Sequence, residues 1–341
     1  MCAVKNSCIY KWFFKYIYNL VGVIMKIGMC GFGRIGRQIF EALLKEKCID
    51  TIFIYDPQLS KSNYDYLLQS ELGQDYNKFK FKINKVKIIS IENKFYNQIR
   101  DINILIECSE KIDLKKILHY NSKLKIITTY FYKDSDVKVA LGYNNIKKDA
   151  QIISGLTCDT IAILPVLKTF LEFDILFLSI ASIHPVLSYQ KPLDNLYFVN
   201  KSIDLAKIRG FVNCAIPRDT SIANIIEIVC PNLKGKVFSY QLRIPTTEVT
   251  SAFITLSTKK KININTVKSK IKKNKYLCFN KDLKISSDFV KVSFSAVIDL
   301  RFFKVHENNC AFLMWYDNEY GYSQRIIDVV KEIGDGSEFN K

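Results

Sequence analysis

The first half of the chain alternates short apolar runs with stretches of helical periodicity. The predicted strands are 26–30, 51–55, 103–107, 124–128 and 137–141. The predicted helices are 34–47, 62–69 and 112–119. Strands that alternate with helices are typical of a parallel sheet. We therefore predict an α/β domain here, in which the lysine-rich segment 78–91 adds antiparallel strands.

The pattern changes after residue 157. Long β-branched runs predict strands at 174–183, 236–244 and 247–257, with helices only at 219–229 and 264–274. These features favour an α+β domain with a mostly antiparallel sheet. We predict a first domain over 25–157, a second over 158–318, and a C-terminal helix, 319–341, that returns to the first.

Residues 1–24 precede the first predicted strand and are set apart as an N-terminal extension. Their apolar run after Asn19 is far shorter than the ~20 residues of a membrane helix, and no signal cleavage pattern follows. Two interpretations are favoured: a start codon set too early, with Met25 as the true start, or a disordered extension. A membrane-surface helix is the third.

Composition narrows the function classes. The 341 residues are 48% hydrophobic and 24% charged, as in a globular protein of two domains. The net charge of +17 is spread over scattered lysines, which favours a solvated surface over a nucleic-acid or membrane site. Ten cysteines without a C-x-x-C pair or Cys/His cluster argue against a metal and against disulfides, and they favour the cytoplasm.

The segment "ISGLTCDTIAILP" places a cysteine at a predicted helix start. Thr157 is a candidate N-cap, so Cys158 falls in the first turn, where unpaired N–H groups and the helix dipole lower the pKa of a thiol. Cys158 is therefore a candidate nucleophile, with a small packed residue as the alternative. His184, at the end of a predicted strand, is a candidate partner or a packed histidine.

The segment "KIGMCGFGRIG" has the spacing of a dinucleotide-binding loop. Gly31, Gly33 and Gly36 follow a strand and open a helix, and Asp56 ends the next strand twenty residues later. An acidic residue at this position hydrogen-bonds a hydroxyl group of the adenine ribose of NAD and repels the 2′-phosphate of NADP. The loop predicts NAD as the cofactor, in preference to NADP.

Six segments together resemble the phosphorylating glyceraldehyde-3-phosphate dehydrogenase family. They are "CGFGRIGRQIF", "IYDP", "SGLTCDTIAILP", "IHPVLSYQKPLD", "LRIPTTEVT" and "WYDNEYGYSQRIID", and the similarity runs from Met25 to about Lys331. The resemblance implies a Rossmann-type NAD-binding domain plus an α+β catalytic domain. It also implies NAD-dependent oxidation of glyceraldehyde 3-phosphate through a cysteine thioester, phosphorolysis of that thioester, and a homotetramer.

The resemblance also implies roles for single residues. Cys158 is the nucleophile and His184 its acid–base partner. The implied cofactor contacts are Gly31, Gly33, Arg34, Ile35, Gly36, Asp56, Thr129 and Asn318. The implied contacts to substrate or phosphate are Thr157, Asp159, Thr160, Arg209, Thr220, Ser221 and Arg243.

Several positions depart from the family pattern, among them three that bear on the predicted site. Asp159 stands where a threonine is usual, Leu187 replaces another threonine, and Glu110 replaces a glycine beside the cofactor. A carboxylate beside the thiol raises the thiol's pKa and repels an attacking phosphate. Leu187 resembles the sister enzyme erythrose-4-phosphate dehydrogenase, which is the alternative function. A non-catalytic paralogue that binds NAD or a polyanion is the second alternative.

Overall fold

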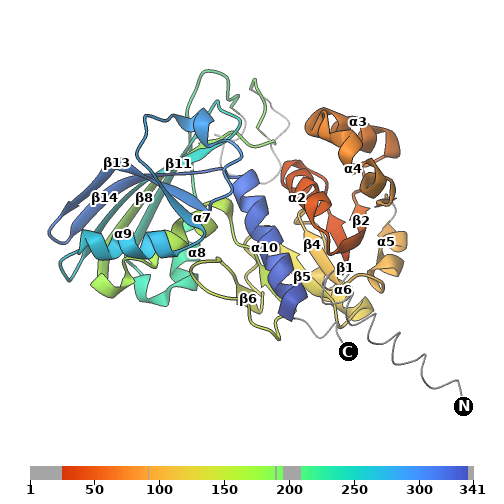
Figure 1. Cartoon of the computed structure of the whole chain (residues 1–341), viewed down its shortest axis with the longest axis horizontal. Coiled ribbons are helices and arrows are strands. Elements are labelled where there is room, and N and C mark those ends of the chain that lie inside the picture. The colour runs from red at the N-terminus through yellow and green to blue at the C-terminus, as the bar shows by residue number, and fades with distance from the viewer. Residues whose placement is uncertain (1–24, 91, 189, 195–208, 337–341) are drawn as a thin grey trace, which may run out of the picture.

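The computed structural model describes residues 25–90, 92–188, 190–194 and 209–336. The chain forms two seven-stranded sheets that lie side by side, and helices pack against both sheets (Figure 1). The N-terminal extension, residues 1–24, and the final residues 337–341 lie outside the described residues, so what was predicted for them stays a prediction.

The first sheet is entirely parallel. Its strands, in spatial order, are β3 (Lys87–Ile89), β2 (Ile49–Tyr55), β1 (Met25–Cys30), β4 (Ile104–Glu107), β5 (Lys125–Thr128), β7 (Ile152–Ser154) and β6 (Val137–Lys138). All four residues of β4 are buried, because the central strands of a parallel sheet are covered on both faces. The predicted strands of the first half are therefore present, although the last is only two residues long.

Helices cover this sheet. They are α2 (Arg34–Lys45), α3 (Lys61–Leu72), α4 (Asp75–Asn84), α5 (Glu92–Ile99) and α6 (Leu114–Tyr120). The prediction of antiparallel strands over 78–91 is wrong, since this segment contains most of α4 and the parallel strand β3. Tyr76, Phe79 and Ile83 pack on the core at helical spacing, and this tertiary packing outweighs the strand-like alternation of the local sequence.

The second sheet is mixed and mostly antiparallel. Its order is β12 (Leu277–Asn280), β13 (Ala296–His306), β14 (Asn309–Tyr316), β11 (Thr250–Thr258), β8 (Ile175–Pro185), β10 (Val237–Ile244) and β9 (Ile216–Arg218). The pairs β8–β10 and β12–β13 are parallel, and the other pairs are antiparallel. Both predicted sheet types are thus confirmed, and the fold class is α/β with an α+β second part.

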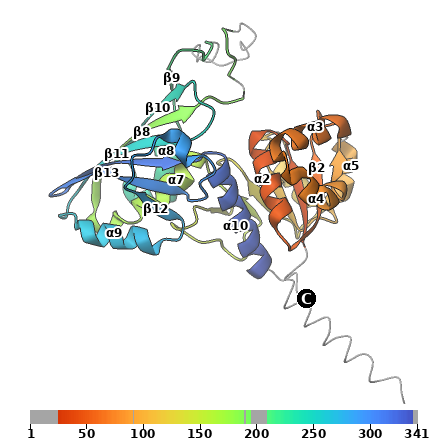
Figure 2. The same ribbon diagram turned by 45° about the horizontal axis from the view of Figure 1, so that its top comes forward.

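Three helices lie on one side of this second sheet (Figure 2). They are α7 (Cys158–Leu167), α8 (Ile222–Val229) and α9 (Ile264–Lys273). Helix α7 is buried almost throughout, which explains its nearly continuous apolar sequence.

The last helix, α10 (Tyr320–Gly336), returns to the first sheet, as its position between the sheets shows (Figure 1). Lys331 forms an ion pair of 2.6 Å with Glu46, and Gly334 lies against the side chain of Met25. The start of α10 therefore lies near the second sheet and its end near the first. The boundary between the domains at 157/158 stays a prediction.

Candidate active site

A cleft of about 440 Å³ lies where the glycine loop meets the start of α7, the end of β8 and the start of α10. It is lined by thirteen of the residues that the sequence singled out: Gly33, Arg34, Ile35, Gly36, Thr129, Thr157, Cys158, Asp159, His184, Thr220, Ser221, Arg243 and Asn318. Tertiary folding thus brings together positions that are almost three hundred residues apart in the chain.

Cys158 is the first residue of α7, as the sequence predicted. The preceding Thr157 is the N-cap, and it forms a capping box with Thr160: the Thr157 amide donates to the Thr160 hydroxyl at 3.1 Å, and the Thr160 amide donates to the Thr157 hydroxyl at 3.4 Å. Thr160 is fully buried and does not line the cleft. Its side chain holds the helix end that presents Cys158.

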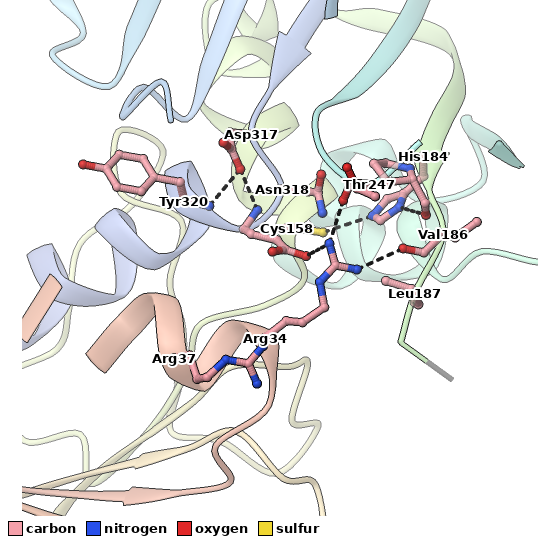
Figure 3. A network of polar contacts seen from close by, with 12 residues as sticks. Arg34, Arg37, Cys158, His184, Val186, Leu187, Thr247, Asp317, Asn318 and Tyr320 are labelled. Atoms are coloured by element: carbon pink, nitrogen blue, oxygen red, sulfur yellow. Dashed lines mark hydrogen bonds and ion pairs between the residues drawn. The ribbon is translucent and has the colours of Figure 1, made fainter. Parts of the chain in front are cut away.

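His184 lies next to this thiol, although it is 26 residues away in the chain. The distance from Cys158 Sγ to His184 Nε2 is 3.7 Å (Figure 3). Strands β8 and β10 pair so that His184 is opposite Arg243, and both side chains are buried. The other ring nitrogen, Nδ1, lies 2.8 Å from the Pro185 carbonyl oxygen and also contacts Arg243 Nη1.

Asp159 places a buried carboxylate beside the thiol as well, and one of its carboxylate oxygens lies within 4.8 Å of a ring nitrogen of His184. Its Oδ2 lies 3.9 Å from Cys158 Sγ, and its Oδ1 accepts a hydrogen bond of 2.5 Å from the Tyr316 hydroxyl. Tyr316 ends β14 and is itself buried. The sequence did not single out Tyr316, and only its place in the segment "WYDNEYGYSQRIID" could have drawn attention to it.

Burial dominates the electrostatics of the pair. It raises the pKa of the Cys158 thiol well above its usual value, and the Asp159 carboxylate raises it further, while Arg243 acts in the opposite direction. Burial also lowers the pKa of His184 to about 4. Burial and the Asp159 carboxylate therefore oppose the thiolate that the helix position alone favoured.

The glycine loop fits a dinucleotide. Gly31 has a φ of +88°, and a Cβ atom on Gly36 would lie 2.4 Å from the Gly31 carbonyl oxygen, so both positions require glycine. A Cβ on Gly33 would meet nothing within 4 Å, which leaves room for a pyrophosphate over the helix N-terminus. Asp56 lies beside the loop, outside the cleft lining, and accepts the Phe32 amide at 2.9 Å.

Asn318 reaches the cleft from the segment before α10. Asp317 accepts the amides of Glu319 and Tyr320, at 3.0 and 2.8 Å, and so holds the start of that helix (Figure 3). The side-chain oxygen of Asn318, Oδ1, accepts a hydrogen bond from the Thr250 hydroxyl at 3.4 Å. Its amide nitrogen then remains available to orient a cofactor group.

Arg34 connects the glycine loop to the second sheet's loops. Its guanidinium donates to the carbonyl oxygens of Val186 and Thr247, at 3.3 and 2.6 Å, and pairs with Glu319 at 2.5 Å (Figure 3). Burial raises the pKa of Glu319 to about 7 despite this partner. The sequence predicted Arg34 as a cofactor contact and did not predict this bridge.

Besides the buried Thr160, one predicted substrate contact does not line the cleft, and that is Arg209. Its side chain is exposed and pairs with Asp194 at 3.2 Å. The departures from the family pattern at Glu110, Asp159 and Leu187 all line the cleft. Glu110 has a φ of +58°, a backbone conformation that favours the glycine usual at that position.

Comparison with known proteins points to the same family as the sequence motifs. The family model described as "Glyceraldehyde 3-phosphate dehydrogenase, C-terminal domain" matches residues 157–318. The chain is 28% identical to glyceraldehyde-3-phosphate dehydrogenase 2 of Bacillus subtilis, over 91% of this chain and 96% of that protein. It is 29% identical to the glyceraldehyde-3-phosphate dehydrogenase of Helicobacter pylori, over 90% of this chain and 98% of that protein.

These matches support the glyceraldehyde-3-phosphate dehydrogenase family for this chain. The low identity to these relatives makes it a divergent member, as the departures at Asp159, Leu187 and Glu110 indicated. In the part of the chain that the structure describes, no helix is both long and apolar enough to cross a membrane.

Proposed function

We propose that this family member oxidises glyceraldehyde 3-phosphate with NAD through a thioester on Cys158, which inorganic phosphate then cleaves to 1,3-bisphosphoglycerate. The coarser part of this function follows from the family: the chain is an NAD-dependent oxidoreductase that acts on an aldehyde phosphate, as predicted from the sequence. The choice of aldehyde, the residue roles and the fate of the thioester belong to the proposal.

The single observation that carries the mechanism is the 3.7 Å distance between Cys158 Sγ and His184 Nε2 inside the cleft. When Nδ1 donates its hydrogen to the Pro185 carbonyl, Nε2 has a free lone pair directed at the thiol. His184 then accepts the thiol proton as Cys158 attacks the aldehyde carbon. The resulting oxyanion lies near the free N–H groups at the start of α7.

His184 next passes the thiol proton to the oxyanion, which gives the hydroxyl group of the thiohemiacetal. It then accepts the proton of that hydroxyl group as the hydride leaves. NAD, when bound, supplies the acceptor for the hydride that leaves the same carbon. Asn318 and the glycine loop hold the cofactor in this assignment. The product is a thioester on Cys158, whose carbonyl carbon faces the cleft.

Anion recognition is assigned to residues of β10 and of the segment before α8. Arg243 is buried on β10, and Thr220 and Ser221 precede α8, whose N-terminal N–H groups favour an anion. The Arg243 guanidinium suits a phosphate oxygen because it donates several hydrogen bonds in a fixed geometry. These residues are proposed to hold the substrate phosphate and the attacking phosphate.

The test is NADH formation with glyceraldehyde 3-phosphate, measured with and without inorganic phosphate, for the full chain and for Cys158→Ser. We expect phosphate-dependent turnover that Cys158→Ser abolishes. Cys278→Ser is the matched control, because this cysteine does not line the cleft. Unchanged turnover in Cys158→Ser would refute the mechanism.

Erythrose 4-phosphate is the second candidate substrate, with water in place of phosphate as the acyl acceptor. It is favoured by the apolar Leu187 in the cleft and by the Asp159 carboxylate, which repels an incoming phosphate. The same assay separates the two functions. A higher kcat/KM with erythrose 4-phosphate, independent of added phosphate, would replace our first proposal.

The uncovered face of the second sheet supports self-association into the predicted homotetramer. Large apolar side chains are exposed there on β8, β10 and β11, namely Phe177, Phe238, Tyr240, Leu242 and Phe253. Isolated monomers rarely leave such a contiguous patch in water. Light scattering should give a tetramer, and Tyr240→Asp should shift it to smaller species.

The cytoplasmic location also remains a prediction.

A further inference from the structure

We infer that Cys158, Asp159 and His184 form a binding site for Zn²⁺, and that a bound ion blocks the nucleophilic thiol of Cys158. Each offers one ligand atom, and these atoms all lie within 4.8 Å of one another. Sγ is 3.7 Å from His184 Nε2 and 3.9 Å from Asp159 Oδ2. Tetrahedral Zn²⁺ with ordinary bond lengths separates such ligand atoms by about 3.6 Å, so small side-chain movements complete the site.

The donor set selects the kind of metal. One sulfur, one imidazole nitrogen and one carboxylate oxygen suit Zn²⁺, whereas Ca²⁺ and Mg²⁺ require oxygen ligands throughout. Asp159 and His184 are buried, while Cys158 is partly exposed at the cleft. The cleft gives a path for the ion and leaves a fourth position for water.

The ligands are already held by second partners. His184 Nδ1 lies 2.8 Å from the Pro185 carbonyl, and donation to that oxygen leaves Nε2 free for a metal. Asp159 Oδ1 accepts from the Tyr316 hydroxyl, which leaves Oδ2 directed at the thiol. Arg243 contacts the far side of the imidazole and also donates to Pro185 at 3.0 Å, so its charge weakens the site without occupying it.

Asp159 is what makes the set a metal site. Without it, only a thiol and an imidazole remain, and two ligands bind Zn²⁺ weakly. The linear sequence shows no metal motif because His184 joins the other two only in the folded chain, through the end of β8. A bound ion would occupy both the proposed nucleophile and the proposed base, and would therefore inhibit reversibly and shield the thiol from alkylation.

The experiment is a Co²⁺ titration of the NAD-free, substrate-free protein, followed by optical spectroscopy and Zn²⁺ competition. We expect one tetrahedral Co²⁺ per chain with thiolate-to-metal absorption, which Zn²⁺ displaces. Asp159→Thr should weaken Zn²⁺ binding at least tenfold, and Cys158→Ser should remove the thiolate band. Tyr316→Phe, a near-isosteric change, should weaken binding roughly tenfold to a hundredfold through the lost second partner.

Cys278→Ser is the control and should bind as the unaltered protein does. Equal Zn²⁺ affinity in Asp159→Thr and the unaltered protein would overturn the site, as would a spectrum without thiolate absorption. If Asp159→Thr does not fold, judged by its thermal melt, Tyr316→Phe decides on the same terms. Because neither substrate nor NAD is present, the result is independent of whether the proposed dehydrogenase activity is found.

Discussion

The carboxylate of Asp159 should hold down the reactivity of Cys158, and Asp159→Asn tests this directly. Asparagine keeps the volume and can still accept from the Tyr316 hydroxyl, so the change removes only the charge, 3.9 Å from Sγ. Two unit charges 4 Å apart interact by about 1 kcal/mol in water and about 4 kcal/mol at an effective dielectric of 20. Removing the carboxylate should therefore increase the thiolate population at least about fivefold.

The alkylation rate of Cys158 should rise by a smaller factor than its thiolate population. A thiolate of lower pKa is a weaker nucleophile, with a Brønsted coefficient of about 0.5, so the alkylation rate should rise roughly twofold to thirtyfold. The assay is sub-stoichiometric iodoacetamide at neutral pH, with peptide mapping of the first label. The mapped label should fall on Cys158 and track the loss of dehydrogenase activity.

The matched control is Tyr316→Phe, which keeps the charge and removes its hydrogen-bond donor. Its labelling rate should not exceed that of the unaltered protein, because the charge beside the sulfur remains. The reasoning fails if Asp159→Asn melts normally yet reacts no faster than the unaltered protein. A first label on another cysteine, with activity already gone, would remove Cys158 as the nucleophile.

Three further predictions follow from the same structure. His184→Asn should slow the alkylation of Cys158 and should slow turnover by roughly a hundredfold or more, because the thiol loses its proton acceptor. The rates of NADH formation and of alkylation measure the two effects. Asp56→Ala should narrow the preference for NAD over NADP, and equal binding of both cofactors by the unaltered protein would contradict the assignment. The pKa of Glu319 is about 7 in the folded protein, above its value of 4.5 in the unfolded chain, so the folded protein binds this proton more tightly. The free energy of unfolding that this proton contributes is therefore lost as the pH rises from about 4.5 through 7. Glu319→Gln should lack this loss, of up to roughly 3 kcal/mol, and thermal melts of the two proteins at several pH values should diverge accordingly.

Local sequence determined the elements whose signals are themselves local. Five of the seven parallel strands, the glycine loop and the start of α7 at Cys158 were predicted because apolar period, glycine spacing and a capping threonine act within a few residues. The order of six quoted segments predicted the family, which the comparisons confirm.

Only the tertiary structure decided features that depend on distant neighbours. Helix α4 replaced the expected strands because Phe79 and Ile83 find the core, and Arg209 remained outside the cleft, paired with Asp194. The thiol of Cys158 provides the sharpest case. Its helix position favours a thiolate and the adjacent Asp159 opposes it, as the sequence predicted. The largest cause of its raised pKa is burial, which is a property of the whole fold that no stretch of sequence carries.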